Sequence, residues 1–125
     1  MSVSYEVREH AEYLELVCTG TYAPEIPLQV AAEGLERAAR AGRTAVLLDI
    51  RGITGREPTM SERYDQAVQV ASLQSSMTSR IRIALLGHEP MIHPQRFGEI
   101  VATNRGALLR VFTEQEPALD WLLGR

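Results

Sequence analysis

The segment Thr44–Ile50 most constrains the fold, because it reads TAVLLDI, an almost unbroken apolar run. Such a run is typical of a strand that is covered on both faces, as strands in parallel sheets are. The segment Arg80–Leu86, RIRIALL, is a second strand candidate further along the chain. We expect both segments to be inner strands of one sheet with helices packed on it.

The rest of the chain alternates between strand and helix patterns. Ser4–Glu9 alternates apolar and charged residues, and Tyr13–Thr19 is an apolar segment closed by Gly20, so the two are predicted to pair as an antiparallel hairpin. Helical periods separate the later strands, giving the order β-β-α-β-α-β-α-β-α. Repeated βα units predict an α/β fold with a mixed, mostly parallel sheet of about five strands and the hairpin at its edge. The 125 residues fit a single domain, 1–125.

Capping signals place two of the helix starts. Thr59 and Glu62 have the spacing of a capping box, and Thr113 with Glu116 has the same spacing before the last helix. We therefore predict that Thr59 and Thr113 cap their helices.

The helix that follows Thr59 carries a broad apolar arc. One stripe of this arc holds Met60, Tyr64, Ala67, Val68 and Ala71, and the residues beside it are Val70, Leu73 and Met77. An arc this wide leaves an exposed apolar patch on a monomer unless a neighbouring helix covers it. We predict a homodimer that uses this helix.

Composition excludes several classes of function. The net charge is -3, and the basic residues, all Arg, form no cluster, so nucleic acid is not an expected partner. The absence of Lys excludes Schiff-base chemistry. The motifs GxGxxG, GxxxxGK[ST] and GxSxG do not occur. No signal-like start and no apolar run near the roughly 20 residues of a membrane span are found, so we predict a cytoplasmic protein without membrane contact.

The loop after Arg80–Leu86 holds the best candidates for a ligand site. Ligands bind at the carboxyl ends of the strands in open α/β sheets, and this loop carries His88, His93 and Arg96. We therefore predict that these three residues bind a small anionic ligand. Because His88, Glu89 and His93 lack the tight spacing of a helical HExxH motif, neither a metal nor another cofactor is predicted. The alternative is that the His residues are solvated or bond to backbone groups.

The strand TAVLLDIRGIT, followed by a loop and a helix, resembles the signature of the STAS domains, the sulphate-transporter and anti-sigma-factor-antagonist superfamily. In that family an Asp-Ser-Ser-Gly element opens the helix, and a partner kinase phosphorylates its Ser. Here the element falls on Glu57, Pro58, Thr59 and Met60, with Thr59 at the phosphorylated position. The order of elements and the ending LLRVFTEQEPALDWLL look closer to a bacterial STAS-like subgroup. That subgroup resembles anti-sigma-factor antagonists, has a CRAL-TRIO-like sheet and lacks the phosphorylatable element.

The resemblance implies a regulatory domain that binds a partner protein, such as a kinase-like protein or a sigma-factor regulator. The candidate partner-binding residues are Thr59, Glu57, Ser61 and Arg51. The helix start at Thr59 also offers free N–H groups and the positive end of a helix dipole to a phosphate or to a partner's acidic group. The alternative is that Thr59 only caps the helix.

No pair of acid and base, or of nucleophile and base, is visible, so we predict that the protein is not an enzyme. The competing function is binding of a small anionic or apolar ligand in a pocket at the carboxyl ends of the parallel strands, near His88, His93 and Phe97. A deep apolar pocket favours ligand binding. A filled core with a flat exposed patch favours protein interaction.

Overall fold

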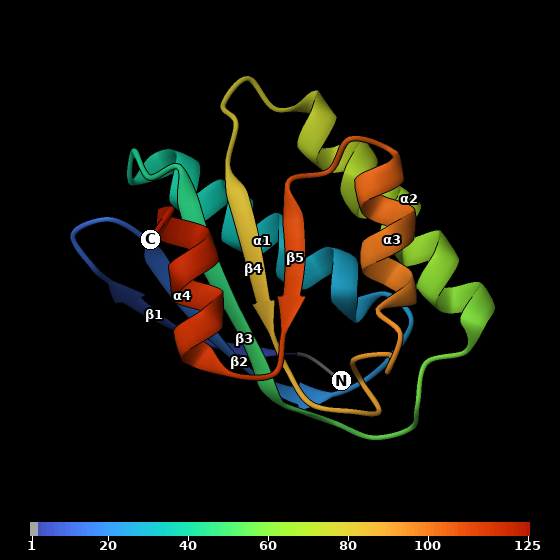
Figure 1. Cartoon of the computed structure of the whole chain (residues 1–125). Coiled ribbons are helices and arrows are strands. Elements are labelled where there is room, and N and C mark those ends of the chain that lie inside the picture. The colour runs from blue at the N-terminus through green and yellow to red at the C-terminus, as the bar shows by residue number, and fades with distance from the viewer. Residues whose placement is uncertain (1–2) are drawn as a thin grey trace.

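The computed structural model describes residues 3–125 as a five-stranded sheet flanked by four helices (Figure 1). The elements are, in chain order, β1 (Ser4–Glu9), β2 (Leu14–Thr21), α1 (Ile26–Arg40), β3 (Ala45–Thr54), α2 (Met60–Ser76), β4 (Arg82–Leu86), α3 (Phe97–Asn104), β5 (Leu109–Phe112) and α4 (Gln115–Leu123). The strands lie in the order β1-β2-β3-β4-β5, with β1 antiparallel to β2 and the other neighbours parallel. The predicted fold class, the order of the elements and the antiparallel edge are confirmed.

The two faces of the sheet are covered differently. On one face, Leu16, Val46 and Leu48 join the larger core, and α1 packs on them. On the other face α4 packs over Leu47 and Leu86 (Figure 1). Helix α2 packs mainly against α1 and α3 rather than directly on the strands. The side chains between α2 and the sheet therefore decide how well that space is filled.

Strand β3 continues to Thr54, four residues beyond the predicted end at Ile50, and β2 runs on to Thr21 through Gly20. The extension is possible because Gly52 has no side chain. A Cβ at Gly52 would lie 2.9 Å from the carbonyl oxygen of Cys18 in β2. The two strands stay paired along this stretch, so the prediction that Gly20 closes the strand is wrong.

The two predicted caps have different outcomes. The Glu62 N–H donates to Thr59 Oγ1 at 3.1 Å and the Thr59 N–H donates to Glu62 Oε1 at 3.0 Å, so the capping box is confirmed. The prediction for Thr113 is wrong. Helix α4 begins one residue later than that cap requires, with Glu114 in the N-cap position and no side-chain cap bond.

The predicted apolar stripe of α2 is not buried at its amino-terminal end, so this part of the prediction is wrong. Met60 is 49% exposed and Tyr64 is 43% exposed. The supposed flanking residues face inward instead, since Val70 is buried and both Leu73 and Met77 pack against the larger core. The reason is that α1 and α3 cover α2 from two sides. Val70, Leu73 and Met77 are therefore covered, whereas Met60 and Tyr64 of the same arc lie on the surface.

No helix in residues 3–125 is both long enough and apolar enough to cross a membrane.

Candidate functional site

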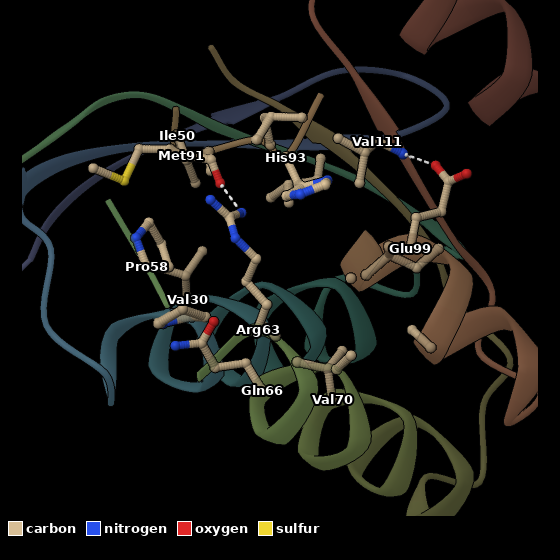
Figure 2. Close-up of a pocket in the computed structure, with 18 of the residues that line it drawn as sticks. Val30, Ile50, Pro58, Arg63, Gln66, Val70, Met91, His93, Glu99 and Val111 are labelled. Atoms are coloured by element: carbon tan, nitrogen blue, oxygen red, sulfur yellow. Dashed lines mark hydrogen bonds between the residues drawn. The ribbon is translucent and has the colours of Figure 1, made fainter. Parts of the chain in front are cut away.

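A cavity of about 150 Å³ lies between the sheet and the helices that cover its first face (Figure 2). It lies toward the carboxyl ends of the parallel strands, where the sequence placed the pocket of the ligand-binding alternative. Its lining is mainly apolar. The apolar lining includes Val30 and Ala31 from α1, Leu48, Ile50 and Ile53 from β3, Ala67 and Val70 from α2, Leu85 from β4, Ala102 from α3 and Val111 from β5. Because α2 stands off the strands, these side chains do not fill the space completely.

Arg63 of α2 is a charged group inside this lining, and its side chain is only 7% exposed. Its Nη1 donates to the carbonyl oxygen of Met91 at 3.0 Å, and its Nη2 donates to that of Pro90 at 2.7 Å. The nearest carboxylate, Glu57, lies 3.9 Å from Nη2 on a side chain that is 64% exposed. The Nε of Arg63 is buried and has no hydrogen-bond partner. An arginine cannot lose its charge in a protein, so the cavity wall holds a permanent cation whose five N–H donors are only partly used.

Sequence reasoning did not predict that Arg63 is buried in the wall of a cavity. A signal was present in the spacing, because Arg63, Ala67, Val70 and Ala71 recur at helical intervals and all four are buried. An arginine at the first position of such a stripe points its charge toward the core.

The three residues predicted to bind an anion are not brought together. His93 and Arg96 line the cavity, whereas His88 does not. The cavity-lining pair already has protein partners. The Gln95 N–H donates to His93 Nδ1 at 3.1 Å, and Arg96 donates to the carbonyl oxygen of Val111. The cavity cation with an unused buried donor is therefore Arg63.

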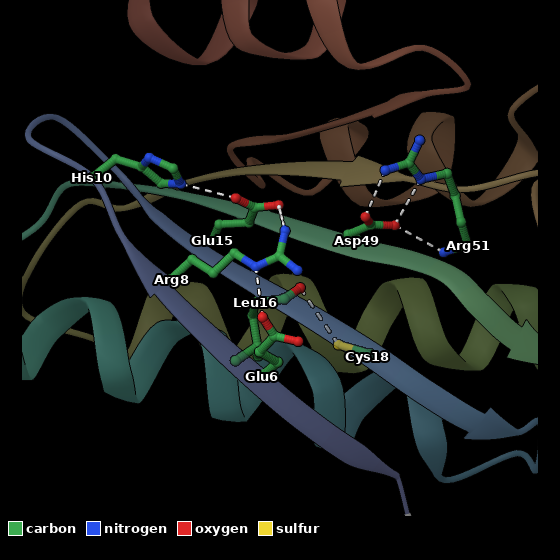
Figure 3. A network of polar contacts seen from close by, with 8 residues as sticks. All are labelled: Glu6, Arg8, His10, Glu15, Leu16, Cys18, Asp49 and Arg51. Carbon is green, nitrogen blue, oxygen red and sulfur yellow. Dashed lines mark hydrogen bonds and ion pairs between the residues drawn. The ribbon is translucent and has the colours of Figure 1, made fainter.

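The four predicted partner-binding residues also separate into two places. Thr59, Ser61 and Glu57 are exposed around the start of α2. Arg51 lies in β3, where its Nη2 donates to Asp49 at 2.8 Å on the face of the sheet that α4 covers (Figure 3). Arg51 therefore does not contribute to a surface at α2.

Polar pairs occupy this second face beside α4 (Figure 3). Burial alone would raise the pKa of Asp49, but hydrogen bonds from the Arg51 side chain and backbone outweigh it and lower that pKa. Glu15 is paired with His10 at 2.8 Å. Cys18 is fully buried toward the larger core, and burial raises its pKa to about 12, as expected for a core residue rather than a reactive thiol. Across residues 3–125, no group of three or more His, Cys, Asp or Glu is placed to hold a metal ion.

The surface at the start of α2 carries an ion pair, in which Arg56 donates to both carboxylate oxygens of Glu62. Arg56 and the backbone N–H of Thr59 hold the pKa of Glu62 down at about 2. The hydroxyl of Thr59 lies beside this carboxylate group through the capping box. A phosphate on Thr59 would therefore lie beside this ion pair and compete with Glu62 for Arg56.

Replacing Thr59 by Ala should lower the free energy of unfolding by about 1 kcal/mol, because the Glu62 N–H loses its side-chain acceptor. Urea unfolding followed by circular dichroism measures this change. The matched control is Thr113→Ala, which removes an exposed threonine that makes no cap and should change stability by no more than about 0.5 kcal/mol. Equal losses in the two variants would contradict the capping role of Thr59.

Comparison with known proteins shows what the fold is. No family model matches the sequence, and no curated protein matches it. Among solved structures, an anti-sigma factor antagonist from Mycobacterium paratuberculosis is similar, with a TM-score of 0.58, 11% identity and coverage of 98% of this chain and 95% of that one. An uncharacterised protein from Shewanella loihica, described as having a SpoIIAA-like fold, aligns with a TM-score of 0.52 at 20% identity, covering 96% of this chain and 93% of that one. The fold of this chain is therefore STAS-like, as the sequence resemblance implied.

Proposed function

We propose that this chain is a non-enzymatic STAS-like regulatory domain that binds a small ligand in the cavity between α2 and the sheet. The observation that carries this proposal is an apolar cavity of about 150 Å³ with the buried, incompletely paired Arg63 in its wall. An apolar cavity of about this size stays dry and accepts a benzene-sized molecule. A deep apolar pocket favours ligand binding, whereas a filled core with a flat exposed patch would favour protein interaction.

A ligand carried through purification would test this function. The protein is purified from its native host and unfolded, and the released small molecules are identified by liquid chromatography and mass spectrometry. We expect one small molecule in near-stoichiometric amount from the unchanged protein. We expect little of it from Ala67→Leu, which fills part of the cavity from α2.

Ala39→Leu is the matched control, because Ala39 is exposed on α1 and outside the cavity. This variant should release as much of the molecule as the unchanged protein does. The same amount from Ala67→Leu, or no molecule from any of the three proteins, would contradict ligand binding in this cavity.

A second candidate function is binding of a partner protein at the start of α2. The observation that favours it is the exposed pair Met60 and Tyr64, which lie one helical turn apart next to Thr59. One neighbour of the same fold is named an anti-sigma factor antagonist, which suggests a kinase-like or sigma-factor regulator as the partner. A homodimer and a cytoplasmic location stay predictions of the sequence.

Affinity capture from the native host tests the second candidate. We expect the unchanged protein to retain a specific regulator, and Thr59→Glu to release it, because the new carboxylate joins Glu62 at this surface. Thr113→Glu places the same charge before α4 and should retain the regulator. Recovery of the same proteins with all three forms would rule out a partner at the start of α2.

A further inference from the structure

The unused donor in the cavity wall indicates what kind of ligand fits there. A buried cation is costly unless a hydrogen-bonded anion compensates it. The guanidinium of Arg63 has two neutral carbonyl partners, and Glu57 stands at 3.9 Å, beyond hydrogen-bond length, on a mostly exposed side chain. The buried Nε has no partner. An anionic oxygen in the adjoining cavity would compensate the charge of the Arg63 guanidinium and accept a hydrogen bond from one of its unused N–H groups.

We propose that the cavity binds a small monocarboxylate, with one carboxylate oxygen accepting a hydrogen bond from the Arg63 guanidinium and an apolar body of about benzene size filling the rest. This inference rests on the ligand-binding function proposed above and names the ligand class. The size follows from the volume of about 150 Å³, about that of a cavity that holds benzene.

The surroundings of Arg63 favour a ligand with a single negative charge. Nη1 and Nη2 of Arg63 each donate one N–H to a backbone carbonyl oxygen, that of Met91 and that of Pro90, which fill part of the space around the guanidinium. The carbonyl oxygens beside it would repel a second charge. The acidic residue in the lining, Glu99, is bonded to the Val111 N–H at 2.6 Å and points away from the guanidinium (Figure 2).

Water is a poorer occupant of this position. A buried water needs two to four polar partners, and the lining around Arg63 is mainly apolar. The amide nitrogen of Gln66, another polar side chain in the lining, already donates to the Tyr22 hydroxyl and to the carbonyl oxygen of Pro24. A carboxylate needs only the one donor and brings its own charge.

The test is calorimetric titration of the whole chain with benzoate and with benzamide, which has nearly the same shape and no charge. The unchanged protein should bind benzoate about tenfold or more tightly than benzamide, the effect expected for a hydrogen bond between charged groups. Arg63→Gln and Arg63→Lys should each lose about tenfold or more in benzoate affinity and leave benzamide nearly unchanged. Arg80→Gln removes an exposed arginine outside the cavity and should change neither.

Glu57→Gln serves if the Arg63 variants fail to fold, because Glu57 is an exposed side chain. It removes the carboxylate that competes for the guanidinium, so benzoate affinity should rise while benzamide affinity stays the same. An unchanged or lower benzoate affinity would contradict the assignment. Equal binding of benzoate and benzamide to the unchanged protein would overturn the carboxylate class but keep the cavity as a ligand site. Binding of neither would count against both proposals.

Discussion

Replacing Leu48 by Ala should lower the free energy of unfolding by about 2–5 kcal/mol. Leu48 lies on the central strand β3, is 2% exposed and packs against Gly34 of α1. It also lines the cavity, so the lost side chain would enlarge a space that the surrounding helices already fail to close. The loss should therefore lie toward the upper end of this range. Urea unfolding at neutral pH measures it.

Leu28→Ala is the matched control for Leu48→Ala. Leu28 is only partly buried at the edge of the larger core, so the same deletion should cost about 1 kcal/mol or less. A comparable loss in the two variants would contradict the central place of Leu48 in the packing between β3 and α1.

Replacing Gly52 by Ala should destabilise the protein by about 1–3 kcal/mol, the usual range for an atom forced into a closely packed site. A Cβ at this position would lie 2.8 Å from Cγ2 of Thr19 and 2.9 Å from the carbonyl oxygen of Cys18. Cys18 lies at the irregularity in the register between Val17 and Thr19, and its carbonyl is a backbone atom, so it cannot turn away as a flexible side chain could. Thermal and urea unfolding both report this loss.

Gly98→Ala makes the same chemical change at a glycine in α3 where a Cβ meets no atom within 4 Å. Helix propensity should make this variant more stable by about 0.5–1 kcal/mol. Opposite signs for the two substitutions are the expected result. A neutral or stabilising Gly52→Ala would show that β2 and β3 do not approach as closely as the structure has them.

Most of the fold was predictable from local patterns. The apolar run TAVLLDI predicted the inner strand, and the pair Thr59 and Glu62 predicted the start of α2, because both signals act over a few neighbouring residues. The end of β3 was not predictable in this way. A glycine such as Gly52 usually marks a turn or a break in a strand. Here Gly52 stays in β3 because this part of β3 pairs closely with β2, whose Cys18 is far away in the sequence.

The candidate site was predictable only in part. The carboxyl ends of the strands indicated the right region, and two predicted residues, His93 and Arg96, line the cavity. His88 was grouped with them from its position in the same loop, and the structure shows that it does not line the cavity. Arg63 was missed although its helical spacing from Ala67 and Val70 placed it on the stripe of α2 that is buried.

Methyl nuclear magnetic resonance shows whether the space between α2 and the sheet admits a ligand. With the Ile, Leu and Val methyl groups labelled, benzene is added to the whole chain. We expect shifts at Val30, Ile53 and Val70, which line the cavity, and none at Leu47 and Leu122, which pack under α4 on the other face. Unchanged signals from the cavity residues, or shifts confined to the α4 face, would contradict a ligand site in this space.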